Sequence, residues 1–488
     1  MSPLDYFIVA IYLITIFYVG IRYRDRSSSF STFMIAGRKV GLSLGVATML
    51  GTELGLITVM YNAQTGFRDF FAAFHIGLFA MVVTMLIGLT GIVVVKLRDL
   101  RVKSIPEYYQ IRFGNKVRVV GAIILAVGGI LNMGLFLKVG AIFIQSVFGI
   151  ADGELVLSVI MVVLLLMVLV YTILGGMISV IITDFIQFVV LSVGMILSVL
   201  FSIYYLGWTN IFTQVEMLSS NPNSIYDPIQ SRGGFYITWQ VILGFVSAVI
   251  WPTAITRALS LDSSETVKKQ YMWSSASFLI RFIVPCFLGI CAYVHFNGYT
   301  PDSSWEKLSM MPRYLTEILP MGVLGIVVAA MVAAFMSTHD SYLLCWSTII
   351  TNDIIDPIKG GKLSSSEKIR YSRIIIVILG LYILYWGLMY NGNDSIWDYL
   401  GITGAVYFTG AISVILFGVY WSRASSAGAM AALLGGLSAL VGLEPIRKSI
   451  PAASSLRPEE IGLMTLGFSI FLMIAFSLLM PDKKEIRS

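Results

Sequence analysis

The chain has 488 residues, of which 57% are hydrophobic and only 12% are charged. Because a soluble globular protein carries roughly 25% charged residues, this composition excludes an ordinary soluble enzyme. The formal net charge is +6, and such a basic balance can indicate either nucleic-acid binding or membrane topology.

Long apolar runs recur along the chain, and a run of about 17 or more apolar residues can cross a bilayer as a helix. The first run, from Tyr6 to Ile21, lacks the basic start and cleavage site of a signal peptide and predicts a retained helix. We therefore expect an all-α, multi-pass protein of the plasma membrane. The thirteen predicted transmembrane segments are residues 5–21, 42–65, 70–95, 119–147, 154–176, 179–206, 235–256, 272–297, 316–351, 369–390, 395–421, 427–443 and 461–480.

The positions of Lys and Arg predict the orientation of these helices. If the N-terminus is outside, 24 of the 33 cations fall in cytoplasmic stretches, including 257–269, and 7 fall in outer loops. Lys138 and Arg281 remain within membrane segments. This asymmetry predicts an outer N-terminus and a cytoplasmic C-terminus, and it explains the basic charge without a nucleic-acid partner.

Two predicted helices contain residues that interrupt helices. Gly51 and Gly55 flank Glu53 in the second segment, and Pro252 lies within the seventh. Interruptions at corresponding places in two halves point to the binding site of an inverted-repeat transporter. The predicted divisions are a first helix with a basic loop (1–40), a five-helix repeat (41–207), an outer loop (208–234), a second, inverted repeat (235–421), and two peripheral helices with a short tail (422–488).

Five ionisable residues lie inside predicted helices, where a charge near the bilayer centre costs at least about 2.5 kcal/mol. They are Glu53, Lys138, Asp184, Arg281 and Asp340. Such residues are functional candidates, although some of them can instead lie near a helix end and reach water with long side chains.

The ninth segment has a polar face. Ala334, Ser337, Thr338 and Ser341 follow the spacing of one helix face, and Asp340 lies about 60° from Ser337 at 100° per residue. Hydroxyl and carboxylate oxygens can replace the water shell of a cation. Small and hydroxyl residues also form packing faces between membrane helices. The spacing alone leaves both interpretations open.

Five stretches, in chain order, resemble motifs of the sodium/solute symporter family. They are Phe33–Arg38; Ile105–Glu107 with Arg112–Gly114; Gly175–Gly176 with Thr183, Asp184 and Gln187; Ala333–Thr338; and Tyr420–Arg423. The resemblance implies a leucine-transporter-like core of five plus five inverted helices, no enzymatic activity, and import of a small solute with Na+ as the coupling ion. We expect a monomeric functional unit in the lipid bilayer; a solute sensor or a channel on the same fold is the alternative of another class.

The resemblance also implies ion sites. The sodium site shared with that fold corresponds to the carbonyls of Ala47, Leu50 and Ala334 and the hydroxyls of Ser337 and Thr338. In members with a second sodium ion, the matching positions are Asp184, Asp340 and Ser341. The extra carboxylate of Asp340 leaves one Na+, two Na+ or a proton open as the coupling ions.

The solute positions implied by the resemblance lie near both helix interruptions. They correspond to Glu53, His75, Asn132, Trp251 and Arg281, with Lys138 nearby. Lys138 and Arg281 favour an anionic group, because cationic side chains form charge-assisted hydrogen bonds with carboxylates. We therefore expect a carboxylate-bearing solute, such as an amino acid or an organic acid. A sugar or polyol, and a purely structural pair of Lys138 with Glu53, remain the alternatives.

Overall fold

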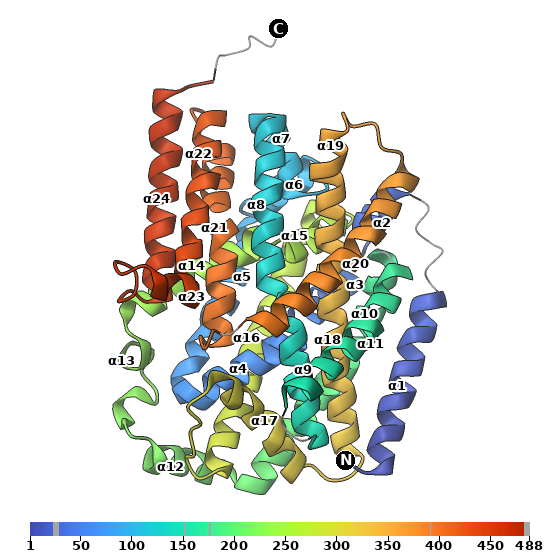
Figure 1. The fold of residues 1–488 in the computed structure, drawn as a ribbon, viewed down its shortest axis with the longest axis vertical. Coiled ribbons are helices and arrows are strands. Elements are labelled where there is room, and N and C mark those ends of the chain that lie inside the picture. The colour runs from blue at the N-terminus through green and yellow to red at the C-terminus, as the bar shows by residue number, and fades with distance from the viewer. Residues whose placement is uncertain (23–28, 151–152, 175–176, 391, 483–488) are drawn as a thin grey trace.

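The computed structural model describes residues 1–22, 29–150, 153–174, 177–390 and 392–482, and they fold into a bundle of helices (Figure 1). No β-strand occurs among these described residues, so the predicted all-α class is confirmed. The helices of the first half are α1 (Pro3–Arg22), α2 (Phe30–Ile35), α3 (Leu42–Glu53), α4 (Leu56–Asp69), α5 (Phe74–Thr90), α6 (Val94–Asp99), α7 (Ile105–Phe113), α8 (Asn115–Met133), α9 (Phe136–Phe148), α10 (Glu154–Leu174) and α11 (Met177–Leu206).

The second half begins with short helices, α12 and α13, and continues with longer ones. Its helices are α12 (Trp208–Leu218), α13 (Pro228–Arg232), α14 (Gly234–Ile250), α15 (Pro252–Ser260), α16 (Ser264–His295), α17 (Ser304–Ile318), α18 (Val323–Ile349), α19 (Asp356–Ile358), α20 (Ser365–Met389), α21 (Ile396–Tyr420), α22 (Ser426–Gly436), α23 (Glu444–Ser449) and α24 (Pro458–Leu479). A π-helical segment, Ile350–Ile355, extends α18.

Serine side chains begin many of these helices. Each accepts a hydrogen bond from a backbone N–H of the first turn, which satisfies a donor that the helix itself leaves unpaired. Ser364 and Glu367 form a reciprocal capping box at the start of α20. The other examples include Ser104 before α7, Ser263 before α16, Ser395 before α21 and Ser425 before α22.

Within the described residues, ten helical stretches are long and apolar enough to cross a membrane, and residues 154–170 and 426–442 form shorter apolar helices. The second predicted segment contains its predicted interruption, because α3 ends after 12 residues and α4 follows the break. α4 is capped by Phe70, which has φ 54° and ψ −139°, and the chain reverses through a 3-10 turn, Phe70–Ala73, into α5, the helix of the third predicted segment. The chain begins at one end of the bundle, and α24 ends at the opposite end (Figure 1).

One helix forms the centre of the bundle. In α18, 89% of the most apolar window is buried, whereas the corresponding value for α1 is 22%. α3 packs against α11, α15, α16 and α18. The polar face predicted for the ninth segment therefore lies inside the protein, next to the predicted interruption of the second segment.

Candidate functional site

The first of two helix breaks follows Glu53. α3 ends at this residue, Leu54 has φ −95° and ψ 62°, and Gly55 is extended before α4 begins. A Cβ atom on Gly55 would lie 1.8 Å from Oγ1 of Thr338, so a larger residue could not bring the break so close to α18. Because an intact helix uses its own carbonyls, a break of this kind frees backbone groups for an ion or a solute.

The second break is at Trp251. This residue has extended backbone angles, φ −68° and ψ 125°, between the end of α14 and the start of α15. Pro252 occupies the first turn of α15, where its missing N–H costs no helical hydrogen bond. The indole Nε1 of Trp251 donates to the hydroxyl of Tyr342 on α18 at 3.0 Å. Both breaks thus adjoin the same central helix.

The residues of the predicted sodium site lie on α3 and α18. Ala47, Leu50 and Ala334 are buried, and Leu50 is inside α3, where its carbonyl accepts from the N–H of Leu54 at 2.7 Å. Oγ1 of Thr338 is buried and has no hydrogen-bond partner among the described residues. An unpartnered buried hydroxyl is costly, and an oxygen in this position is a suitable ligand for a small cation.

Ser337 contacts two acceptors at once. Its Oγ lies 3.0 Å from the carbonyl of Gly51 and 2.5 Å from Oδ1 of Asp184. A hydroxyl carries a single proton and can donate to only one of them at a time. One of these two acceptor oxygens, the Gly51 carbonyl or Oδ1 of Asp184, therefore remains available to bind a cation.

A larger group of polar residues, which we name the cation cluster, surrounds Asp184. Each of its members is at most 3% exposed: Thr48, Thr52, Asp184, Arg257, Ser337, Asp340 and Ser341. Oδ2 of Asp184 accepts from Thr48 at 2.7 Å and from Thr52 at 3.3 Å. The same oxygen lies 3.4 Å from Nη2 of Arg257. Four helices, α3, α11, α15 and α18, contribute to the cluster.

Asp340 supplies a second carboxylate. Its Oδ1 accepts from Oγ of Ser341 at 3.3 Å, and Ser341 in turn accepts from Nη2 of Arg257 at 2.5 Å. Oδ2 of Asp340 is buried without a hydrogen-bond partner in the described part of the chain. Two carboxylates therefore face one guanidinium. The predicted second-cation residues Asp184, Asp340 and Ser341 lie together.

The position of Arg257 corrects one step of the topology prediction. In the predicted topology, this residue belongs to the cytoplasmic stretch 257–269, because the apolar run ends at residue 256. In the structure, α15 continues to Ser260 and Arg257 is 0% exposed. A strongly polar side chain directly after a run broken by Pro252 was the available signal.

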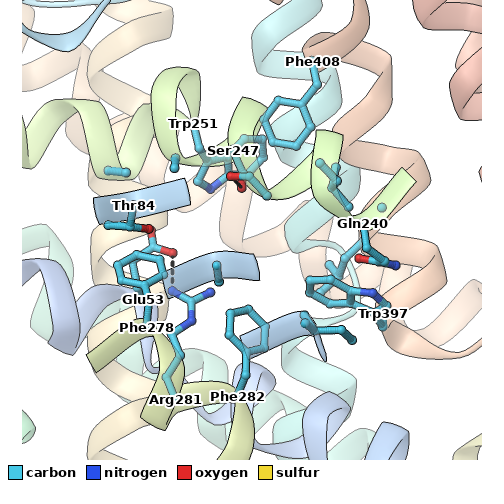
Figure 2. Close-up of a pocket in the computed structure, with 18 of the residues that line it drawn as sticks. Glu53, Thr84, Gln240, Ser247, Trp251, Phe278, Arg281, Phe282, Trp397 and Phe408 are labelled. Carbon is cyan, nitrogen blue, oxygen red and sulfur yellow. Dashed lines mark hydrogen bonds and ion pairs between the residues drawn. The ribbon is translucent and has the colours of Figure 1, made fainter. Parts of the chain in front are cut away.

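A cavity of about 130 Å3, which we name the solute cavity, lies between the two breaks (Figure 2). Its lining includes Glu53, Asn132, Trp251 and Arg281 from the predicted solute site. Residues that the sequence analysis did not single out complete the walls: Thr84, Gln240, Ser247, Phe278, Phe282, Tyr342, Trp397 and Phe408. Their only sequence signal was that they are aromatic or polar residues within the third, seventh, eighth, ninth and eleventh predicted segments.

An ion pair forms one wall of the solute cavity. Nη1 of Arg281 lies 2.8 Å from Oε2 of Glu53, and Oγ1 of Thr253 donates to the other oxygen of Glu53 at 3.3 Å. The guanidinium carbon lies 4.6 Å from the ring centroid of Phe278 and 4.8 Å from that of Phe282. Figure 2 shows Arg281 pointing from α16 toward Glu53. Aromatic faces hold the guanidinium in place while its edge stays free for hydrogen bonds.

The backbone carbonyl of Arg281 also has a hydrogen-bond partner on another helix. Pro285 lies inside α16 and lacks the N–H that would bond to the carbonyl of Arg281, four residues earlier. Nδ2 of the buried Asn62 on α4 donates to that carbonyl at 3.4 Å. This contact ties α16 to α4, the helix that follows the first break.

Not all of the predicted solute residues contribute to the solute cavity. His75 is buried, with Nδ1 2.5 Å from the carbonyl of Ala72, and does not line the cavity. Lys138 also lies outside the lining: its Nζ donates to the carbonyl of Tyr390 at 3.2 Å and lies 4.3 Å from the ring centroid of Trp305. The alternative pair of Lys138 with Glu53 is absent, because the partner of Glu53 is Arg281.

Comparisons with known proteins agree with this architecture. The sequence model of the sodium:solute symporter family matches residues 33–436. The chain is 24% identical over 454 residues to sodium/proline symporter 2 of Staphylococcus saprophyticus, covering 88% of this chain and 84% of that protein. It is similar to the same extent to a sodium/proline symporter of Staphylococcus aureus.

Two solved structures share the fold. A substrate-bound, outward-open Na+-coupled sialic acid symporter superimposes with a TM-score of 0.82 at 19% identity, covering 99% of both chains. MhsT in complex with L-phenylalanine superimposes with a TM-score of 0.59 at 12% identity, covering 91% of this chain and 99% of that one. These likenesses confirm the predicted leucine-transporter-like fold. The chain belongs to the sodium:solute symporter family, and it is a multi-pass plasma-membrane protein that couples solute movement to Na+ and is not an enzyme.

Proposed function

We propose that this symporter imports a small carboxylate-bearing solute, an amino acid or an organic acid, and that the solute binds in the solute cavity. The carboxylate of the solute contacts Arg281, and an amine or hydroxyl of the solute contacts Glu53. The single observation that carries the proposal is the Glu53–Arg281 ion pair in the wall of a small, aromatic-walled cavity between two helix breaks. An ion pair presents both charges that a zwitterion needs, and charge-assisted hydrogen bonds are roughly twice as strong as neutral ones.

The size of the cavity favours a small solute. An engineered cavity of about 150 Å3 holds benzene, and the solute cavity, at about 130 Å3, is comparable. A metabolite with a handful of heavy atoms fits without rearrangement, whereas a larger sugar would require the walls to move. The names of the sodium/proline symporters among the relatives agree with this class of solute.

We further propose that Na+ binds where α3 meets α18. Its ligands are the hydroxyls of Ser337 and Thr338 and the carbonyls of Ala47, Leu50 and Ala334. The unpartnered Oγ1 of Thr338 supports this assignment. A second cation binds in the cation cluster, where the carboxylates of Asp184 and Asp340 outnumber the guanidinium of Arg257.

The gradient supplies enough free energy for uptake. One Na+ crossing about 100 mV yields about 2.3 kcal/mol, and a tenfold concentration gradient adds about 1.4 kcal/mol. Transport with one Na+ would thus accumulate a neutral zwitterion by several hundred-fold, and a second Na+ would multiply that ratio.

The test uses the purified protein in liposomes with an inward Na+ gradient. Uptake is measured for a panel of radiolabelled amino acids, organic acids and sugars, with K+ replacing Na+ as the control. We expect Na+-dependent uptake of at least one carboxylate compound and competition by its close analogues. Uptake restricted to sugars or polyols would contradict the solute class, and uptake unaffected by K+ replacement would contradict the coupling ion.

A further inference from the structure

A second cavity, of about 330 Å3, lies between α11 and α16 and opens sideways; we name it the lateral groove. Its rim consists of aliphatic side chains that are more than half exposed: Ile196 at 59%, Leu200 at 56% and Ile280 at 56%. Ile196 and Ile280 lie near the middle of long apolar helices, and Leu200 lies one turn beyond Ile196 on α11. In a membrane protein, this depth is the hydrocarbon core of the bilayer.

The floor of the lateral groove reaches the first helix break. Leu50 and Leu54 line it and are 3% and 9% exposed. Leu54 is the residue at the break, and its neighbour Gly55 packs against Thr338 of the proposed sodium site. Arg281 lines both the lateral groove and the solute cavity. The groove therefore adjoins both the proposed ion site and the proposed solute site.

The side chains that line the lateral groove favour an apolar ligand. Apart from Ser192, Ser277 and Arg281, every described residue that lines the groove is apolar, and Arg281 directs Nη1 to Glu53. A polar or anionic ligand would lose its hydration there and would find only these three side chains for hydrogen bonds. Water is scarce at this depth, and an empty space forfeits packing contacts. A neutral hydrocarbon chain from the surrounding bilayer satisfies all of these conditions.

We propose that one acyl chain of a bilayer phospholipid binds in the lateral groove and stabilises the conformation of the break between α3 and α4. The volume is adequate: it is roughly twice that of a cavity of about 150 Å3 that holds benzene. The chain enters between Ile196 and Ile280 and contacts Leu54. This lipid site is independent of which solute the protein transports, because its lining and its direct test do not involve the solute.

The test is photolabelling in nanodiscs with a phosphatidylcholine that carries a diazirine at the middle of one acyl chain. Labelled positions are identified by peptide mass spectrometry. We expect the label to concentrate on the lining segments of α11 and α16, residues 188–200 and 277–285, above its level on lipid-facing residues of α10 and α20. An even distribution over all lipid-facing helices would overturn the proposal, because it would indicate bulk lipid only.

Two matched variants sharpen the test. Val199→Trp places an indole in the groove, whereas Val163→Trp makes the same change on a lipid-exposed face of α10. We expect Val199→Trp to reduce the label on α11 and α16 to the level found on α10, and to weaken the stabilisation by Na+. Val163→Trp should change neither. A groove label that persists at full strength in Val199→Trp would overturn the proposal; if that variant does not fold, Ser192→Phe replaces it with the same expected outcome.

Discussion

The solute cavity and the cation cluster both include residues from the end of α3, Glu53 and Thr52 respectively, and they balance charge differently. In the solute cavity, one carboxylate, Glu53, meets one guanidinium, Arg281, and aromatic rings form much of the wall. In the cation cluster, two carboxylates, Asp184 and Asp340, meet one guanidinium, Arg257, and the other members are hydroxyl residues.

This difference indicates what each region can bind. A balanced pair has no net charge to attract an ion, so it suits a solute that itself carries both charges. An excess carboxylate inside a low-dielectric interior needs a further positive charge, since an unpaired buried charge is strongly unfavourable. The hydroxyls of Thr48, Thr52, Ser337 and Ser341, which already contact these carboxylates, provide further oxygen ligands. Thr52 of the cluster and Glu53 of the cavity are consecutive residues at the end of α3, so an ion at one region can affect a solute at the other.

The largest effect is expected from removing the central carboxylate of the cation cluster. Asp184→Asn leaves Arg257 buried with a weaker partner, and breaking a buried ion pair costs about 3–5 kcal/mol. We expect a large drop in the thermal unfolding temperature of the purified protein and loss of its stabilisation by Na+. The matched control is Asp302→Asn on an exposed loop, which should change neither property.

Unchanged thermal stabilisation by Na+ in Asp184→Asn would contradict cation binding by the cluster, because Asp184 and Arg257 would then form a structural ion pair only. If the variant is too unstable to purify, Asp340→Asn gives the same test, since it removes the excess charge and leaves the contact between Asp184 and Arg257 intact.

The next effect concerns the solute. Arg281→Gln removes the charged donor of the solute cavity, and hydrogen bonds to charged groups contribute about 1.5–3 kcal/mol. We expect KM for the carboxylate substrate to rise by about tenfold to a hundredfold, measured by uptake into liposomes. Lys138→Gln is the control, since Lys138 lies outside the cavity lining. An equal loss in both variants would indicate a long-range charge effect instead of a contact.

Much of this architecture could be predicted from the sequence, because the signals are local. The apolar runs, the Gly and Pro interruptions and the helical spacing from Ala334 to Ser341 each depend on residues within a few turns. The inverted-repeat division of the chain stays a prediction, as does the side of the membrane on which each terminus lies. The exact helix limits were harder to predict, because the second segment divides into α3 and α4 and the turn Phe70–Ala73 separates α4 from α5.

Partners distant in sequence were not predictable. Glu53 and Arg281 are 228 residues apart, and nothing near either residue identifies the other. Lys138, within two turns of Asn132, was therefore an equally reasonable partner. Arg257 was missed for a related reason: hydropathy places the end of the segment one residue before it, and only the packing of α15 against α3 and α18 buries its side chain.

A smaller effect is expected at the proposed sodium site. Ser337→Ala combined with Thr338→Ala removes two neutral oxygen ligands, and we expect the Na+ concentration for half-maximal thermal stabilisation to rise by about tenfold or more. Ser347→Ala with Thr348→Ala is the matched control on the same helix, because those hydroxyls bond to carbonyls of α18 itself. A normal Na+ response in the double variant at residues 337 and 338 would exclude both hydroxyls as ligands.

The smallest effect comes from a third charged group, located outside the membrane-spanning segments, in which Arg447 pairs with Asp394 and Lys448 pairs with Glu444. Asp394, between α20 and α21, lies 3.3 Å from Arg447, and its backbone N–H donates to Glu444 at 3.1 Å. Burial raises the pKa of Asp394 to about 6, with Arg447 opposing the shift and Glu444 adding to it. This group shows what burial does to a carboxylate where a proton can come from water.

The sign of the pH effect follows from the raised pKa. In the unfolded chain, an aspartate titrates near about 3.9, so the folded protein holds the extra proton between that pH and about 6. The contribution of Asp394 to stability is therefore complete below about pH 4 and is lost as the pH rises through about 6. Because the side chain is 16% exposed, we expect an effect on the free energy of unfolding of only about 1 kcal/mol after allowing for solvent screening.

Thermal unfolding at about pH 4.5 and about pH 7.5 measures this effect. Asp394→Asn should flatten the difference between the two pH values, and Asp302→Asn should leave it as it is; an unchanged slope in Asp394→Asn would show that the proton binds elsewhere.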